Sequence, residues 1–280
     1  MSLNIYICQS HVIIRQMERA RFCHLTVDLV KKQAYVWHEA DWKFSDEWHS
    51  HHMGQLIFVE KGVQYLHTSE RTYLLPTHHC AWIPPGLMHR TSSPVNPVYL
   101  RCIFVSQTPN DTFFKEVNIF HTPKVLREMI LFTEQWSRLE EEDPLELDFL
   151  KALIGILPIT FQSALPLVLP VPQNPRIARM IDYLTENIAN DIKIPELALN
   201  FNLSARTMER LFKQDIGITV AGYIKLYKII KAVELLSVTG ETVKSVARQV
   251  GYDSVSTFSN TFYNVLGLRP QEMIFGGIPN

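Results

Sequence analysis

Two histidines at alternate positions, His49 and His51, have the residue type and spacing in this sequence best suited to metal or ligand chemistry. If the chain is extended there, both imidazoles point to the same side, because successive side chains of a strand alternate between its faces. Such a pair, joined by a third histidine from another strand, has suitable geometry for a divalent transition metal. The same imidazoles could instead line a pocket for a small molecule, or be hydrogen-bonded residues of a folded sheet. The pattern alone is compatible with all three roles.

The segment that contains these histidines resembles the two motifs of a cupin barrel. Residues 48–55 read Trp-His-Ser-His-His-Met-Gly-Gln, and residues 82–89, which come after Gly62, read Trp-Ile-Pro-Pro-Gly-Leu-Met-His. The match covers about residues 21–110 and is to the cupin version that is found fused to a DNA-binding domain. It implies that His89 is brought next to the first motif.

The resemblance therefore implies one site formed by His49, His51, Gln55 and His89, which would hold a divalent transition metal or a small-molecule effector. Metal-binding cupins usually complete the ligand set with a glutamate, and this chain has Gln55 at or near that position. A neutral amide is a poorer ligand than a carboxylate and offers no charge compensation. Gln55 thus weakens the metal interpretation, and a metal stays an alternative to an organic effector.

The strands that must carry this site are indicated by short runs of β-branched and aromatic residues, which alternate with turn residues between residues 27 and 105. Such spacing is typical of an antiparallel barrel or sandwich. The runs cover residues 55–59, 63–67, 72–75, 81–83 and 99–105. His78 and His79 fall between two runs, so we expect them in a turn at the surface.

Two helices follow the strands. Apolar residues recur at helical spacing over residues 122–139 and again from residue 145 to about residue 161, where Pro158 is expected to bend or end the helix. The apolar faces of both helices could pair between two subunits, or pack on their own barrel. The sequence pattern allows either arrangement.

A proline-rich segment divides the chain. Pro166, Pro170, Pro172 and Pro175 fall within a stretch where no regular helix or central strand is expected, so we interpret residues 164–175 as a linker. The N-terminal domain then covers residues 1–163, with a barrel at about 21–110 and helices at about 122–163. The C-terminal domain covers residues 176–276.

The C-terminal domain contains a weak internal duplication, with an offset of roughly 49 residues before a turn and roughly 50 after it. The matching positions are Leu197 and Val246, Ala198 and Ala247, Asn202 and Gly251, Ser204 and Ser254, Met208 and Phe258, Phe212 and Phe262, and Gly217 and Gly267. The change in offset falls at the turn, where an inserted residue costs least.

Each copy has the pattern of a helix-turn-helix unit. A short helix is followed by a turn with Asn202 or Gly251, which can adopt positive φ, and then by a serine that caps a second helix. The units cover residues about 194–215 and 243–266. A long helix over residues 220–237 joins them and could set two recognition helices one DNA turn apart, roughly 34 Å. An ordinary helical bundle is the alternative explanation of the repeat.

Residues from about 176 to 275 resemble the DNA-binding domain of the AraC/XylS family of transcription regulators. The residues that carry the resemblance are Leu197, Ala198, Leu203, Ser204, Arg210, Leu211, Phe212, Lys213, Ala232, Leu235, Leu236, Val246, Ala247, Gly251, Tyr252, Ser254, Phe258, Phe262, Gly267, Arg269 and Pro270. The two resemblances imply an α+β chain of two domains. The first is an antiparallel, cupin-like (RmlC-like) barrel with flanking helices, and the second is an all-α, homeodomain-like double helix-turn-helix domain.

The resemblance also implies that the second helix of each unit enters the major groove of DNA. In the first unit Arg206 or Arg210 could bind guanine through two hydrogen bonds, and Lys213 could contact a phosphate. In the second unit Asn260 could bind adenine and Val255 could contact a thymine methyl group. The predicted DNA-binding residues are Ser204, Ala205, Arg206, Thr207, Glu209, Arg210, Lys213, Ser254, Val255, Ser256, Thr257 and Asn260.

The chain departs from the family pattern at several cationic positions. It has Tyr263 and Asn264 where the family usually has a basic pair, Lys228 where arginine is usual, and Phe275 near a position where arginine is common. Each lost cation removes a phosphate contact and the counterion release that accompanies it. We therefore expect the second unit to bind DNA weakly by itself.

Composition sets the remaining limits. With 280 residues, of which 46% are hydrophobic, the chain can bury a sizeable core. Residues 173–280 contain 12 Lys and Arg against 10 Asp and Glu, so the assignment to DNA binding rests on motifs, not on charge. No apolar run is long enough to cross a bilayer, and the first residues lack a secretory pattern, so we expect no membrane association and a cytoplasmic location. Cys8, Cys23, Cys80 and Cys102 are expected to be reduced thiols.

Together these observations predict a transcription regulator, not an enzyme, in which a sensed molecule or metal changes how two DNA-binding units are presented. Promoter DNA and an effector are the expected partners, with a second copy of the chain and RNA polymerase as further ones. The alternatives are a metal-dependent cupin enzyme, such as a dioxygenase or isomerase, with a helical appendage, and a DNA-binding protein without an effector. The enzyme would leave the duplicated helix-turn-helix without a role.

Overall fold

A computed structural model describes residues 23–139, 141, 143–161, 167–190, 192–237 and 240–274. The chain divides into two units. The first contains residues up to Lys61 and from His78 to Ala164, and the second contains Gly62–Thr77 and the residues from Leu165 onward.

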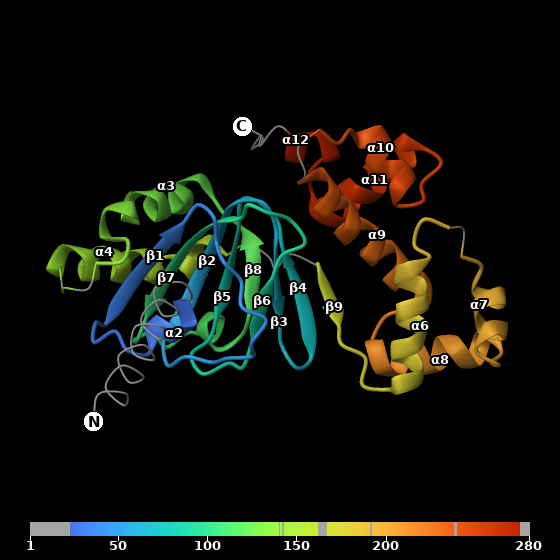
Figure 1. Cartoon of the computed structure of the whole chain (residues 1–280), viewed down its shortest axis with the longest axis horizontal. Helices are drawn as coiled ribbons and strands as arrows, with labels where there is room; N and C mark the ends of the chain where they lie inside the picture. The colour runs from blue at the N-terminus through green and yellow to red at the C-terminus, as the bar shows by residue number, and fades with distance from the viewer. Residues whose placement is uncertain are drawn as a thin grey trace, which may run out of the picture. The chain divides into compact units, whose positions relative to one another are not determined.

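The first unit is built on an antiparallel five-stranded sheet with the strand order β1-β7-β2-β5-β8 (Figure 1). Its strands are β1 (Ala34–Glu39), β2 (Gly54–Lys61), β5 (His79–Ile83), β7 (Tyr99–Val105) and β8 (Asn118–His121), and the short strand β6 covers Arg90–Ser92. Strands therefore lie where the sequence pattern predicts them, and β1 and β8 are added at the two edges of the sheet.

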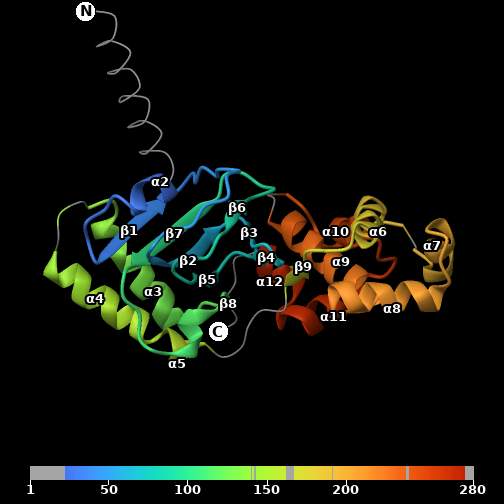
Figure 2. The same ribbon diagram turned by 90° about the horizontal axis from the view of Figure 1, so that it is seen from below.

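Helices cover one face of this sheet (Figure 2). They are α3 (Lys124–Phe132), the 3-10 turn η2 (Thr133–Trp136), α4 (Pro144–Gly155) and α5 (Leu157–Thr160); α2 (Cys23–Val27) and η1 (Thr112–Lys115) complete the unit. Leu126, Ile130 and Leu150 pack in one core with Phe58 and Trp82 of the sheet. Both predicted helices exist, but the first becomes a 3-10 turn at residue 133, and the second is divided before Leu157.

A glycine at the start of β2 makes room for the largest side chain of this core. A Cβ atom at Gly54 would lie 2.5 Å from the ring of Trp82, which no real side chain tolerates. The Trp82 indole is fully buried, and its Nε1 donates a hydrogen bond to the carbonyl of Phe114 at 3.1 Å. Gly54 therefore allows β2 to lie directly beside the tryptophan.

The second unit contains three antiparallel strands and seven helices among the residues that the structure describes. The strands are β3 (Gln64–His67), β4 (Arg71–Leu75) and β9 (Val168–Pro170), and the helices are α6 (Pro175–Glu186), α7 (Ile194–Asn200), α8 (Ala205–Ile216), α9 (Val220–Leu236), α10 (Val243–Gln249), α11 (Val255–Leu266) and α12 (Pro270–Ile274). In Figure 1, α9 runs from α8 to α10 and α11. Both predicted helix-turn-helix units and the helix that joins them are present.

The segment that we interpreted as a linker lies only partly within the described residues, since residues 162–166 fall outside them. The described part contains β9, a short edge strand that pairs with β4. Pro170 ends this strand at the edge of the sheet, where a residue without a backbone N–H is tolerated. The spacing of the prolines could not predict this strand, because β9 pairs with β4, about a hundred residues earlier in the chain.

A cluster of polar groups ties β3 to α9 within the second unit. The hydroxyl of Tyr65 donates to the carboxylate of Glu234, which also accepts a hydrogen bond from Lys231 Nζ at 2.6 Å. Glu234 is buried, so its charge depends on these two donors. Burial of the tyrosine and the neighbouring Glu234 carboxylate raise the pKa of Tyr65.

No helix among the residues described is long and apolar enough to span a membrane.

A buried ion pair between Lys32 and Glu146 generates a prediction for the stability of the first unit. Lys32 Nζ lies 2.5 Å from the Glu146 carboxylate and 2.9 Å from the carbonyl of Leu139, and both side chains are almost fully buried. Replacing Lys32 by methionine leaves a buried carboxylate without its cation and should lower the free energy of unfolding by about 3–5 kcal/mol. Urea unfolding followed by tryptophan fluorescence measures this, because all five tryptophans lie between residues 37 and 136 in the first unit.

The matched control is the double variant Lys32→Met/Glu146→Leu, which removes both charges. It should recover most of the lost stability, because two apolar side chains of similar volume need no counter-charge. A single variant as stable as the native protein would show that the pair is not a determinant of this fold.

Candidate nucleic-acid interface and effector site

The first helix-turn-helix unit consists of α7, a four-residue turn and α8. Asn202 adopts a positive φ of 53° in the turn, and the Ser204 side chain accepts a hydrogen bond from the backbone N–H of Thr207 at 3.2 Å. Gly217, with a φ of 83°, ends α8. The predicted turn residue and N-cap are both confirmed.

The second unit repeats this arrangement with α10 and α11. Gly251 takes a φ of 73° in the turn, and the Ser254 side chain accepts from the backbone N–H of Thr257 at 3.3 Å. Gly267, also with a φ of 73°, ends α11. Two local signals in the sequence, a residue tolerant of positive φ and a serine two or three positions later, thus locate both recognition helices.

The inner faces of α8 and α11 are buried as predicted. Met208, Phe212, Phe258 and Phe262 have no exposed surface, whereas Leu211 is half-buried. Helices α8, α10, α11 and α12 all contact α9, so the two units share one helix as part of their cores.

Most of the predicted DNA-binding side chains of the first unit lie on the outer face of α8 or at its N-terminus. Arg206, Arg210 and Lys213 are exposed, as is the capping Ser204, while Ala205 and Thr207 are half-buried. The exposed cations leave α8 on the side opposite its buried face, which is the arrangement that insertion into a major groove requires.

Glu209 has a second role that the sequence did not reveal. Its carboxylate lies 3.3 Å from the backbone N–H of Val220, the first residue of α9. A carboxylate at a helix N-terminus satisfies a free donor and is stabilised by the helix dipole. A glutamate eleven positions before a helix start gives no local capping signal, so only the fold brings the two together.

In the second unit Ser254, Val255, Ser256, Thr257 and Asn260 are all exposed. The side-chain oxygen of Asn260, however, accepts a hydrogen bond from Arg269 Nη1 at 2.8 Å. The Arg269 guanidinium also lies 4.5 Å from the centroid of the Tyr263 ring.

The sequence matches Arg269 to the family pattern but does not indicate its role. It orients Asn260 and covers Tyr263, which stands where the family usually has a cation. The Arg-Pro pair at the start of α12 was the available signal, but its contact with α11 depends on the packing of the two helices. Phe275, the other departure near the end of the chain, lies outside the described residues.

The predicted histidine cluster is formed in the sheet-containing unit of residues up to Lys61 and from His78 to Ala164. The ring centroids of His49 and His89 lie 4.4 Å apart, and those of His51 and His89 lie 5.2 Å apart. A pair of backbone hydrogen bonds, from His49 N to His89 O and from His89 N to His49 O at 2.9 and 2.8 Å, joins the two segments. His51, His89 and Gln55 are buried, and His49 is half-buried.

Each imidazole of the cluster is oriented by a main-chain carbonyl two residues away. His49 Nδ1 lies 3.1 Å from the Glu47 carbonyl, His51 Nδ1 lies 2.6 Å from that of Met53, and His89 Nδ1 lies 2.8 Å from that of Leu87. Because a carbonyl only accepts, Nδ1 carries the proton in each ring. In His51, whose pKa is lowered by burial, Nε2 is then the acceptor atom of the neutral ring.

Gln55 contacts the acceptor side of His51. Gln55 Oε1 lies 3.1 Å from His51 Nε2, and Gln55 Nε2 lies 3.5 Å from the Cys102 Sγ. Since His51 has already donated its only N–H to Met53, the amide satisfies Nε2 when its NH₂ group is turned toward the ring. Burial lowers the pKa of His51, which keeps this ring neutral.

The donor set does not fit a bound metal in this arrangement. No group of three or more His, Cys, Asp or Glu side chains among the described residues is placed to hold a metal ion. The Gln55 amide lies at the nitrogen that His51 would use as a ligand, and a carboxylate is missing from the predicted set. The cluster is suited instead to accept hydrogen bonds from a polar organic molecule.

His79, which we predicted at the surface, is buried in β5, so this prediction is wrong. Its strand pairs with β8, and the rings of His79 and His121 lie edge to face with centroids 5.4 Å apart. His78 is half-buried with a φ of 64°, as expected of a turn residue. The strand begins two residues earlier than the predicted run of residues 81–83.

Paired, capped helix-turn-helix units and a sheet unit with an enclosed polar cluster define a transcription regulator that combines a DNA-binding domain with a ligand-binding domain. Residues 33–200 match the family model described as "AraC-like ligand binding domain", and residues 197–274 match that described as "Helix-turn-helix domain". The chain belongs to the AraC family of transcription regulators.

Curated relatives agree with this assignment. The chain is 26% identical over 226 residues to the HTH-type transcriptional regulator NimR of Escherichia coli (strain K12), which covers 81% of each chain. It is 31% identical over 98 residues to the HTH-type transcriptional activator RhaS of Enterobacter sp. (strain 638), covering 35% of each. Among solved structures, the C-terminal domain of AraT, a response regulator from Geobacillus stearothermophilus, is 26% identical and covers 38% of this chain and 89% of its own, with a TM-score of 0.36.

A buried histidine outside the cluster gives a prediction of pH dependence. Burial, assisted by the nearby Arg101 guanidinium, lowers the pKa of His38 from 6.5 to about 3. Its Nε2 lies 2.8 Å from the Thr133 hydroxyl, which itself donates to the carbonyl of Ile130. The folded state thus holds His38 neutral, whereas the unfolded chain takes up a proton below pH 6.5.

The stability contributed by neutral His38 is present above pH 6.5 and is lost as the pH falls toward 3. Between pH 6.5 and pH 5 the loss for this residue should be about 2 kcal/mol. Urea unfolding at several pH values measures the slope, and His38→Gln, which can still donate to Thr133, should reduce it. An unchanged slope in this variant would exclude His38 as the titrating group.

Proposed function

We propose that the protein is a cytoplasmic, effector-responsive regulator in which both recognition helices bind promoter DNA. The observation that carries the proposal is the pair of serine-capped recognition helices with exposed outer faces, α8 and α11, built on the shared helix α9. An effector must bind one arrangement of the DNA-binding units better than another in order to regulate. We assign sensing to residues 1–163 and DNA binding to residues 176–276.

The proposed base contacts of the first unit are made by Arg206 and Arg210, with Lys213 on a phosphate. In the second unit the exposed surface of α11 carries hydroxyl groups, Val255 and Asn260, with no cation, so its contribution is base and shape readout with little counterion release. Glu209 and Asn260 are proposed to orient neighbouring groups as well as face the DNA, because each already holds a protein partner.

The effector proposed for the histidine cluster is a small organic molecule that carries hydroxyl or N–H donors. The imidazoles of His49, His51 and His89 and the Gln55 amide lie together in this cluster and would form hydrogen bonds with such groups. A transition metal is the alternative occupant, which the test below separates.

We also propose that the regulator acts as a homodimer and that it contacts RNA polymerase at its promoters. Val125 and Phe132 of α3, Leu145 of α4 and Ile159 of α5 are exposed apolar side chains, although the inner faces of these helices are used in the core of their own unit. Exposed apolar groups of this kind suit an interface. Catalysis is not proposed, because the relatives that the chain matches are described as transcription regulators.

The DNA-binding proposal predicts that Arg206→Ala/Arg210→Ala loses sequence preference. Each bidentate contact between arginine and guanine is worth about 1–3 kcal/mol, so the double variant should bind its preferred site roughly a hundredfold more weakly and approach its nonspecific affinity. Mobility shift with DNA from the gene neighbourhood, at two salt concentrations, measures both quantities.

The control is Lys213→Ala, a phosphate contact in the same helix. It should weaken binding to all sequences about equally and reduce the salt slope by about 1. If the arginine double variant keeps the sequence preference of the native protein, α8 is not the recognition helix.

The effector proposal predicts a thermal shift of the first unit with hydroxylated or amine-bearing compounds. A ligand at a hundredfold its Kd adds about 2.7 kcal/mol to the stability of the state that it binds. His51→Phe, which keeps an aromatic ring beside Phe104 but removes both ring nitrogens, should abolish the shift. A shift with Zn²⁺ or Ni²⁺ but with none of the organic compounds would favour the metal.

A further inference from the structure

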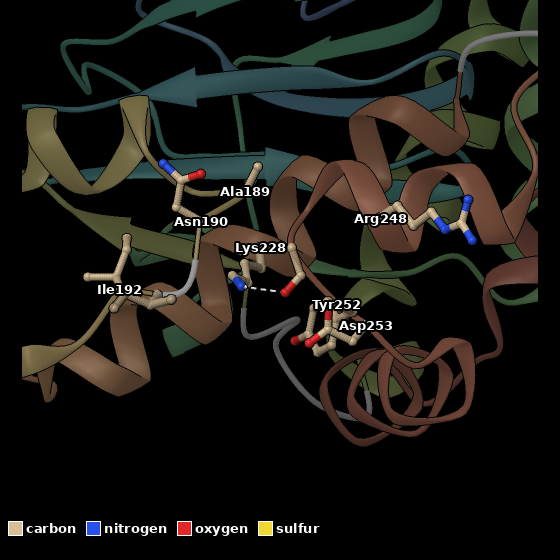
Figure 3. A pocket seen from close by; sticks show the side chains of 9 residues that line it. Ala189, Asn190, Ile192, Lys228, Arg248, Tyr252 and Asp253 are labelled. Atoms are coloured by element: carbon tan, nitrogen blue, oxygen red, sulfur yellow. Dashed lines mark hydrogen bonds between the residues drawn. The ribbon is translucent and has the colours of Figure 1, made fainter.

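A lysine of the shared helix is bound to the turn of the second helix-turn-helix unit (Figure 3). Lys228, in the middle of α9, donates a hydrogen bond from Nζ to the carbonyl of Gly251 at 2.9 Å. The same Nζ lies 5.2 Å from the centroid of the Tyr252 ring. Lys228 is half-buried. The charge is therefore used inside the domain, on the turn that leads into α11.

A segment of the first half of the domain reaches the same point. A Cβ atom at Gly251 would lie 2.7 Å from the carbonyl oxygen of Ala189, in the loop between α6 and α7, and 2.8 Å from Lys228 Nζ. Helix α6, which comes directly before this loop, contacts the first recognition helix, α8. We call the contact of Ala189, Lys228 and Gly251 the Lys228 junction. It brings the loop between α6 and α7, the turn of the second helix-turn-helix unit and α9 together, in a space too small for one methyl group.

A cavity of about 610 Å³ lies beside the junction, within the DNA-binding domain. Ala189, Asn190 and Ile192 line it from the loop before α7. Arg248, Tyr252 and Asp253 line it from the second unit, and Ile224 lies with Lys228 on α9. In Figure 3 the Lys228 hydrogen bond lies between the two groups of lining residues. The turn of the second helix-turn-helix unit is thus bound by Lys228, next to the α6–α7 loop and at the edge of this cavity.

We propose that the Lys228 junction determines the spacing of the two DNA half-sites that the regulator accepts. Helix α9 fixes the approximate separation of the two units, and the junction fixes the rotation of α11 about α9. A rotation of the second unit changes which base step its recognition helix meets, whereas the side chains that contact each half-site stay the same. Lys228 is therefore a positioning residue, and the proposal rests on DNA binding by both units.

The position of Lys228 also explains why it does not replace the phosphate contact that an exposed cation would supply. An ammonium that donates to a main-chain carbonyl and lies against an aromatic ring is held by the protein on both sides. A salt-dependent DNA contact would instead require this group to leave Gly251. The two roles predict different effects on half-site spacing, which can be measured.

The test is in vitro selection of DNA from a random library with the full-length protein, comparing the native sequence with Lys228→Met and Lys228→Arg. The native protein should select two half-sites at one fixed spacing. Lys228→Met should select the same half-site sequences over several spacings. Its affinity for the native two-half-site fragment should fall about tenfold, because the second contact is no longer held in register, while its affinity for a single half-site stays unchanged. Lys228→Arg should restore the fixed spacing.

The matched control is Lys225→Met, which removes an exposed lysine from the same helix one turn earlier. It should leave the spacing fixed. Gly251→Ala provides a second variant if Lys228→Met fails to fold, as judged by circular dichroism. The added methyl group must move Ala189 or Lys228 away, so the preferred spacing should shift or broaden.

One fixed spacing in both Lys228→Met and Gly251→Ala would overturn the proposal. Equal loss of affinity for single and paired half-sites in Lys228→Met would overturn it too, because that pattern belongs to a phosphate contact or to general destabilisation. Failure of the native protein to select any DNA would instead contradict DNA binding by these units, which is a separate outcome.

Discussion

The packing of α9 is the constraint on which the arrangement of the DNA-binding unit depends. Both helix-turn-helix units are too small to enclose a core of their own, and each completes its core against the same helix. Tyr223 and Ile230 of α9 are buried, and Tyr223 lies edge to face with Phe212 of α8. Because a packed core has few alternative arrangements, the shared helix α9 sets the approximate separation of the two recognition helices. Polar contacts at Glu234 and Lys228 then fix how neighbouring segments sit on that helix.

The histidine cluster is likewise positioned by the surrounding fold, here through main-chain contacts. Three main-chain carbonyls hold three imidazoles in one tautomer, so the acceptor atoms are set before any ligand binds. A site of this kind is organised by backbone geometry, and its side chains lose little freedom on binding. The replacement of the expected glutamate by Gln55 then has a chemical consequence, since the cluster lacks the carboxylate that would compensate the charge of a bound cation.

Features with a local signature were predictable from the sequence, and features that depend on distant pairing were not. Asn202, Gly251 and the capping serines act within a few residues of their own positions, so their spacing located both recognition helices and their buried faces. The convergence of His89 with His49 and His51 followed from resemblance to a barrel, not from spacing. The burial of His79 depends on pairing with β8, and β9 depends on pairing with β4. The hydrogen bonds of Glu209 and Lys228 likewise join segments that only the folded chain brings together.

The placement of Gly62–Thr77 with the second unit has a consequence for how such a protein can be recombined. The chain passes from the first unit to the second after residue 61, returns after residue 77 and passes over again after residue 164. A single cut in the proline-rich segment would therefore separate α9 from the hairpin residue, Tyr65, that donates to its buried Glu234. Chimaeras that exchange sensing halves at that position alone would pair an unfamiliar hairpin with this helix. A chimaera that keeps this contact would need to keep residues 62–77 together with the helices that follow residue 165.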